Sequence, residues 1–93
     1  MKTTIIVTAP APQYALNSIL TLAGAISAQA PHECESDRRK DGTYRITFKT
    51  KGGASQAMRL ACRELNADGK QCTHYNDYSG IFYDAASAKF EEG

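Results

Sequence analysis

The pattern of hydrophobic and polar residues in the first part of the chain predicts a strand, a helix and a second strand. Residues 3–9 are rich in β-branched side chains and stop at Pro10, as a central strand does. Between residues 13 and 28, apolar side chains recur at the spacing of one helical face, and Pro31 ends this helix. These apolar residues are Leu16, Ile19, Leu20, Ala23 and Ile26. Residues 32–36 then alternate as a short polar edge strand does.

The clearest alternation lies at residues 44–49. Tyr44, Ile46 and Phe48 share one side of this predicted strand, and the polar residues between them share the other. This pattern indicates a sheet with one covered face, and we expect Tyr44 and Phe48 to point toward the helices that cover it. The preceding turn, residues 37–42, ends in Asp-Gly and predicts a hairpin with the strand before it.

A second helix is predicted after the glycine pair at residues 52–53. Its apolar residues recur at helical spacing up to the Asp-Gly stop at 68–69. They are Ala54, Met58, Ala61, Cys62 and Leu65. Residues 71–75 and 81–84 predict two further short strands around a turn, and residues 85–93 should be frayed or weakly helical.

The order strand, helix, strand, strand, helix, strand predicts an α+β domain with the ferredoxin-like split β-α-β arrangement, βαββαβ. An extra strand near the carboxyl end is allowed for, and both helices should cover one face of an antiparallel sheet. The 93 residues are expected to form a single domain, since domains usually span about 100–200 residues. An architecture of this kind hosts many functions, so it names none.

Charge and cysteine content narrow the function classes. Eleven basic and ten acidic side chains give a formal net charge of +1, which excludes an acidic nucleic-acid mimic and a histone-like basic binder. No run approaches the ~18 consecutive apolar residues of a membrane helix, so we expect no membrane partner. Pro10 and Pro12 interrupt the N-terminal apolar stretch, which argues against a signal peptide. The odd number of cysteines, three, favours a reducing, cytoplasmic location.

Candidate metal-ligating and catalytic residues occur only in pairs. His32 with Cys34, and Cys72 with His74, have the spacing of ligands on one side of a strand. In a ferredoxin-like sheet these two strands lie at opposite edges, so the pairs cannot share a zinc ion. Cys72 and His74 lack an orienting third group, and the glycines at 52–53 lack the lysine ending of a phosphate loop. The sequence therefore predicts no enzyme, no metal and no cofactor.

Residues 75–84 are the main candidate for a functional surface. They mix aromatic residues with Asn, Asp, Ser and Gly, a composition that combines rigid contact area with adaptable hydrogen bonding at protein interfaces. Phe82 and Tyr83 are adjacent in the predicted strand and must face opposite ways, and we expect Phe82 in the core and Tyr83 outside. The predicted protein-binding residues are Tyr75, Asp77, Tyr78 and Tyr83.

The first predicted function is therefore a non-enzymatic protein-binding or regulatory module. Its partner is another protein, or a second copy of the chain that pairs at an exposed sheet edge to form a homodimer. A stand-alone domain of this size with no catalytic constellation is also typical of the inhibitors that phages and mobile elements encode against host systems.

The alternative prediction is a module that binds single-stranded nucleic acid. Basic side chains in the turn and on the outward side of the strand 44–49 would form one stripe on the open face of the sheet. Modules of this kind also need open-face aromatic side chains on which bases stack. The residues of this stripe are Arg38, Arg39, Lys40, Arg45 and Lys49.

Overall fold

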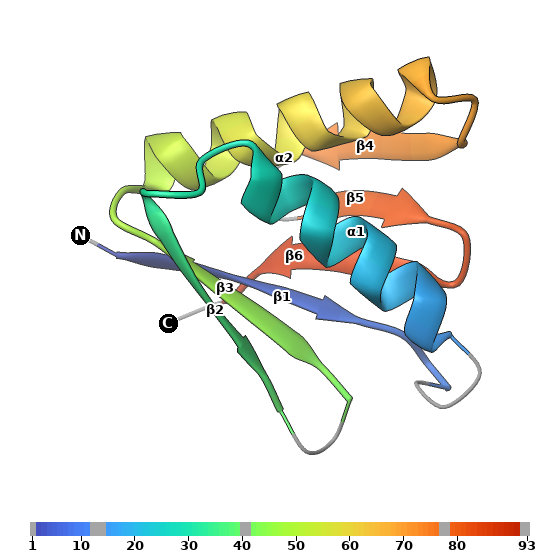
Figure 1. Cartoon of the computed structure of the whole chain (residues 1–93), viewed down its shortest axis with the longest axis horizontal. Coiled ribbons are helices and arrows are strands. Elements are labelled where there is room, and N and C mark those ends of the chain that lie inside the picture. The colour runs from blue at the N-terminus through green and yellow to red at the C-terminus, as the bar shows by residue number, and fades with distance from the viewer. Residues whose placement is uncertain (1, 12–14, 40–41, 77–78, 92–93) are drawn as a thin grey trace.

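The computed structural model describes residues 2–11, 15–39, 42–76 and 79–91 of the chain. They form six strands and two helices, arranged as one sheet with both helices on the same face (Figure 1). In chain order these are β1 (Thr3–Thr8), α1 (Leu16–Ala28), β2 (Cys34–Arg38), β3 (Tyr44–Phe48), α2 (Lys51–Ala67), β4 (Cys72–Asn76), β5 (Gly80–Tyr83) and β6 (Ala86–Phe90).

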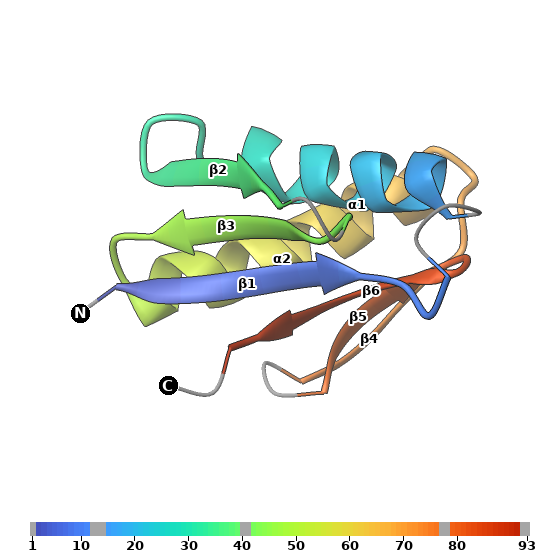
Figure 2. The same ribbon diagram turned by 90° about the horizontal axis from the view of Figure 1, so that it is seen from below.

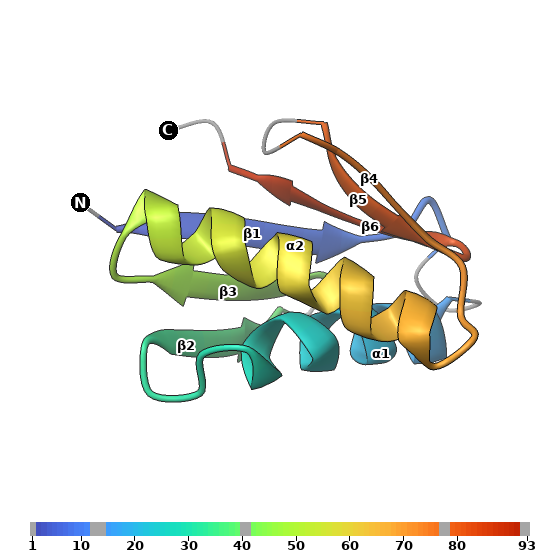
Figure 3. The ribbon, with the colours of Figure 1, turned by 90° about the horizontal axis from the view of Figure 1, so that it is seen from above.

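The strand order is β2-β3-β1-β6-β5-β4, and every neighbouring pair is antiparallel. Figures 2 and 3 show the molecule from opposite sides. The sheet lies in front of α2 in Figure 2 and behind it in Figure 3, so α2 lies against one face of the sheet. The α+β class, the antiparallel sheet and the two helices on one face are thus confirmed. The simple βαββαβ arrangement is wrong in strand number and order, because β6 takes the place beside β1, and β5 and β4 extend the sheet beyond it.

The prediction for the segment 85–93 is wrong where the structure describes it. Residues 86–90 form β6, an inner strand between β1 and β5. Ala86, Ala88 and Phe90 are buried, while Ser87 and Lys89 on the other side are more exposed. Alanines and one phenylalanine carry a weak alternation signal, and this is why the sequence alone did not reveal the strand.

The core lies between the sheet and the helices. Its largest fully buried side chains come from β1, β3 and β5 and from the facing sides of α1 and α2. They are Ile5, Val7, Ile19, Leu22, Ile26, Ile46, Phe48, Met58 and Ile81. Burial in β3 follows the predicted alternation, with Phe48 in the core and Tyr44 packed against it.

Two element boundaries differ from the expectation and matter for the surface. Helix α2 starts at Lys51 rather than Ala54, because the Thr50 Oγ1 atom accepts a hydrogen bond from the Gly53 amide (3.0 Å) and caps the helix. Strand β2 covers residues 34–38 instead of 32–36. Asp37 and the residue after it, expected in a turn, are therefore paired with β3.

Neither helix in the described part of the chain has the length and apolar character that crossing a membrane requires.

Candidate functional site

The face of the sheet opposite the helices is uncovered, and we call it the open face. Residues paired across neighbouring strands point to the same face, so the strand register identifies its members. They are Glu35, Asp37, Arg45, Thr47, Thr4, Ile6, Thr8, Lys89, Ser87, Phe82 and Thr73. Tyr75 lies at a register shift in β4 and belongs to this face through its ring contact with Phe82. The open face is mostly polar over β2, β3 and β1, and aromatic over β5 and β4.

The aromatic end of the open face contains Tyr75, Phe82 and Lys89, which we call the aromatic patch. The Tyr75 and Phe82 rings meet edge to face, with centroids 5.5 Å apart and planes at 72°. The Lys89 ammonium lies 5.7 Å from the centroid of Phe82, within the range of a cation–π contact. Tyr75 keeps 65% of its surface exposed, although it contacts Phe82. The patch therefore presents two rings and one cation to solvent.

The orientation predicted for the adjacent aromatic residues of β5 is reversed. Tyr83 pairs with two buried residues, Cys72 of β4 and Ala86 of β6, and is itself half-buried against the core. Phe82 points to the open face instead. The hydrophobic Ile81 takes the core position, and this fixes the phase of the strand, because side chains alternate.

The other predicted protein-binding residues divide between the patch and the turn. Tyr75 is exposed, as expected, and belongs to the patch. Asp77 and Tyr78 lie outside the described residues. After them, the Ser79 amide donates to the Asn76 Oδ1 atom (2.7 Å), and Gly80 begins β5 with a φ of 79°.

Gly80 is required by its close approach to β6. A Cβ atom at this position would lie 1.9 Å from the Ala88 carbonyl oxygen, and its positive φ disfavours other residues as well. The glycine thus allows β5 to approach β6 closely at Ala88 and Lys89.

The sequence did not identify two members of the patch, Phe82 and Lys89. Lys89 lies in a segment expected to be frayed, and Phe82 was assigned to the core. The available signal for Phe82 was Ile81 beside it, since an isoleucine is a better candidate for a buried strand position than a tyrosine.

The predicted basic stripe is not a continuous surface. Arg38 pairs with Tyr44, so it lies on the helix side of β2, opposite to Arg45. Arg39 forms an ion pair with Asp37, with Nε and Oδ2 3.2 Å apart. Lys40 lies outside the described residues. Arg38 was expected in a turn, but β2 extends to include it, and its pairing with Tyr44 fixes the side on which it lies.

The two remaining basic residues of the stripe have acidic partners. The Arg45 Nη1 atom donates to the Glu91 Oε1 atom at 2.7 Å, and the Lys49 ammonium lies 3.9 Å from the Glu33 carboxylate. The Arg45 Nε atom is buried and has no hydrogen-bond partner among the described residues. The ion pairs leave this half of the open face close to neutral.

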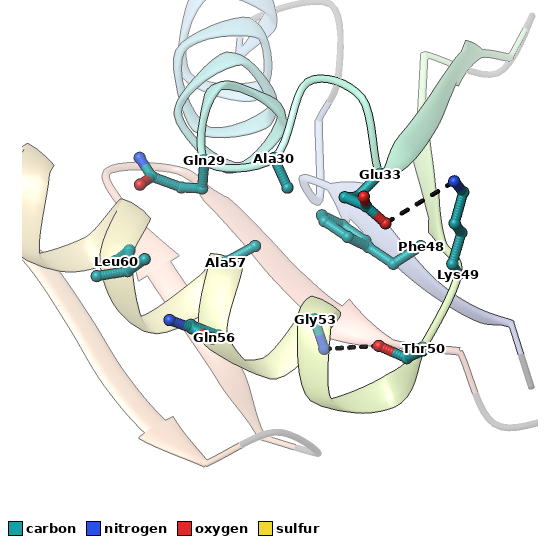
Figure 4. Close-up of a pocket in the computed structure, with 10 residues that line it drawn as sticks. All are labelled: Gln29, Ala30, Glu33, Phe48, Lys49, Thr50, Gly53, Gln56, Ala57 and Leu60. Atoms are coloured by element: carbon teal, nitrogen blue, oxygen red, sulfur yellow. Dashed lines mark hydrogen bonds and ion pairs between the residues drawn. The ribbon is translucent and has the colours of Figure 1, made fainter.

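A pocket of about 250 Å³ lies between the end of α1, the start of α2 and the end of β3 (Figure 4). Phe48 and Ala57 form its apolar part, and the Glu33–Lys49 ion pair lies at its side (Figure 4). The Gly53 amide at the start of α2 donates a hydrogen bond to the Thr50 Oγ1 atom. Small-molecule sites usually measure about 300–1,000 Å³, so the pocket adds no support for a cofactor.

The histidine and cysteine pairs lie far apart, as the sequence predicted. Cys34 is on β2 and Cys72 with His74 is on β4, and these strands form the two opposite edges of the sheet. Within the described ranges, no three His, Cys, Asp or Glu residues cluster in a way that could hold a metal ion.

Comparison of the chain with protein-family models, with curated proteins and with solved structures finds no match. Function is therefore inferred from the geometry of the molecule alone.

Proposed function

We propose that the protein is a small non-enzymatic module that binds another protein through the aromatic patch. The observation that carries this proposal is the 65% exposure of Tyr75, held in edge-to-face contact with Phe82. Tyrosine offers a large amphipathic contact area at low entropic cost, and exposed rings of this kind are enriched at the energetic centres of interfaces. A fixed pair of rings on a sheet needs little ordering when a partner binds.

The chemistry around the patch supports a protein partner. Arg39, Arg45 and Lys49 are each paired with a carboxylate, so these three residues do not form an extended cationic track. Thr73 and Ser87 flank Phe82 in the register and can form hydrogen bonds at the rim of an apolar contact. In this proposal the protein acts in the cytoplasm and regulates its partner, for example as an inhibitor of a host system. The partner can also be a second copy of the chain, which gives a homodimer.

The test compares capture by the wild-type protein with capture by Tyr75→Ala and Phe82→Ala. Leu20→Ala is the matched control, because Leu20 is the other exposed large hydrophobic side chain among the described residues, at 40%, and lies on α1. A partner captured by the wild-type protein and identified by mass spectrometry is then titrated against each variant. Loss of a hot-spot ring costs about 2 kcal/mol, or about 30-fold in Kd.

We expect the Tyr75 and Phe82 variants to show that loss and the Leu20 variant to bind as the wild type does. Circular dichroism checks that each variant is folded, and sedimentation of the protein alone tests for a homodimer. Equal affinity of all three variants for the partner would remove the aromatic patch as the contact surface.

One observation favours the alternative, single-stranded nucleic-acid binding. The open face does carry aromatic side chains beside a lysine, although on β4 and β5 rather than on β3. A fluorescence titration with random single-stranded oligonucleotides at two salt concentrations tests it. Binding that weakens as salt rises, and that Phe82→Ala reduces, supports this function, whereas no binding at low salt eliminates it.

A further inference from the structure

Cys62 on α2 and Cys72 on β4 lie together, and the Asn66 side chain fixes their surroundings. The Asn66 Nδ2 atom lies 3.9 Å from the Cys62 sulfur and 3.1 Å from the Cys72 carbonyl oxygen. The Asn66 Oδ1 atom accepts a hydrogen bond from the Cys72 amide (2.8 Å). The connection between the helix and the strand is tight, since the Lys70 amide donates to the Leu65 carbonyl at 2.9 Å. The two cysteines are thus held side by side at one edge of the sheet.

Both cysteines are free of disulfide bonds and buried, with 5% of Cys62 and 8% of Cys72 exposed. Burial, followed by the hydrogen bond with the Cys62 thiol and its charge, raises the pKa of Cys72 to about 12. At neutral pH the Cys72 thiol therefore stays protonated and reacts slowly in the closed structure, because the thiolate is the nucleophile.

We propose that Cys62 and Cys72 form an intramolecular disulfide when the protein meets a small disulfide oxidant such as glutathione disulfide. The Asn66 side chain contacts both the Cys62 sulfur and the Cys72 backbone, so the sulfur–sulfur bond of about 2 Å would join two residues that are already neighbours. β4 is an edge strand, and edge strands open locally more readily than the centre of a sheet, which gives the oxidant access.

The reaction is thiol–disulfide exchange in two steps. One protein thiol loses its proton and attacks a sulfur of glutathione disulfide, forming a mixed disulfide and releasing one glutathione thiolate. The second protein thiol then loses its proton and attacks the protein sulfur of that mixed disulfide, which releases the second glutathione. Glutathione disulfide gains the two electrons that the cysteines lose. The two protons released by the cysteines protonate the two glutathione thiolates.

The new bond would connect the C-terminal half of α2 to the edge strand that carries Tyr75. Tyr75 follows Cys72 on the same strand, so the disulfide would limit the local opening of β4 beside the aromatic patch. Cys34 cannot take part, because it lies on β2 at the opposite edge of the sheet. It provides the control for an unrelated thiol.

The experiment uses the full chain, unfolded in urea and refolded by dilution into a glutathione redox buffer, so that access to buried thiols does not limit the reaction. Intact-mass spectrometry follows the wild type, Cys34→Ser, Cys62→Ala and Cys72→Ala. We expect the wild type and Cys34→Ser to lose two hydrogen atoms, and Cys62→Ala and Cys72→Ala not to form this species. Trypsin digestion of the oxidised wild type should yield the Cys62 and Cys72 peptides as one linked species.

The proposal is overturned if the refolded wild type keeps free thiols, carries only mixed disulfides with glutathione, or links Cys34 to another cysteine. The peptide map is made on the wild type, so it decides the question even if an alanine variant fails to fold. The oxidised form should also have a higher thermal midpoint than the reduced form, since the cross-link restricts the unfolded chain.

Discussion

At the start of β4, the Asn66 side chain forms the hydrogen bonds that a neighbouring strand would otherwise form with the backbone of Cys72. Replacing Asn66 tests how much these bonds stabilise the fold. The side chain satisfies both the amide and the carbonyl of Cys72, at 2.8 and 3.1 Å. In Asn66→Ala both backbone groups lose their partner at a half-buried site. At about 1 kcal/mol for each lost hydrogen bond, the cost is about 2 kcal/mol.

Helix propensity acts in the opposite direction. Asn66 lies in α2, and alanine is favoured over asparagine in a helix by up to about 0.7 kcal/mol. The expected net loss of stability is therefore about 1.3 kcal/mol. For a domain of this size it lowers the thermal midpoint by roughly 5–10 °C, because each kcal/mol shifts it by about 4–8 °C.

Asn17→Ala is the matched control for this prediction. Asn17 is an exposed residue of α1, so the same substitution changes helix propensity without removing the contacts to β4. Urea denaturation followed by circular dichroism measures both variants, and hydrogen exchange of the Cys72 amide reports the lost bond directly. The reasoning fails if Asn66→Ala is as stable as Asn17→Ala and the Cys72 amide remains as protected as in the wild type.

Three further predictions concern the backbone, the helix start and the buried thiol. Gly80→Ala should lower the free energy of unfolding, measured by urea denaturation, by at least ~1 kcal/mol, because the new Cβ would lie 1.9 Å from the Ala88 carbonyl oxygen. A variant as stable as the wild type would contradict this close approach. Thr50→Ala should cost about 1 kcal/mol through loss of the α2 cap, whereas Thr50→Ser should restore most of it. Because burial raises the pKa of Cys72 from 9.0 to about 12, its neutral form stabilises the folded state below pH 9, and this contribution is lost as the pH rises toward 12. Urea midpoints measured across that range should decline less steeply in Cys72→Ala, and parallel curves would show that Cys72 does not contribute.

The strands and helices with strong periodic patterns could be predicted from the sequence. In β3, Ile46 and Phe48 alternate with polar residues, and in α2 the apolar residues recur at helical spacing, so both elements were found within a few residues of their ends. Strand β6 could not be found this way. Its inward side chains include Ala86 and Ala88, which are small enough to occur in any element, and only the pairing with β1 and β5 makes them part of a strand.

The surface was harder to predict than the core, because its composition depends on strand register. Because β2 extends to residue 38, Arg38 pairs with Tyr44 on the helix side, and Asp37 lies opposite Arg45. The carboxylate of Glu91 approaches Arg45 only because β6 returns the chain to β1. Neither contact has a signal in the local sequence, so the cationic surface inferred from residue types alone was overestimated.

The central place of β6 also governs the order in which the sheet is completed. Ile5 pairs with Phe90, so β1 lacks one of its two neighbours until the chain has been made almost to residue 90. Before that point the β4–β5 hairpin has no strand that connects it to β1. Contacts between residues so distant in sequence form slowly, and a nascent chain on the ribosome exposes the unpaired backbone edge of β1 in the meantime. Cutting the chain before residue 86 would therefore leave two separate small sheets instead of a shortened version of this one.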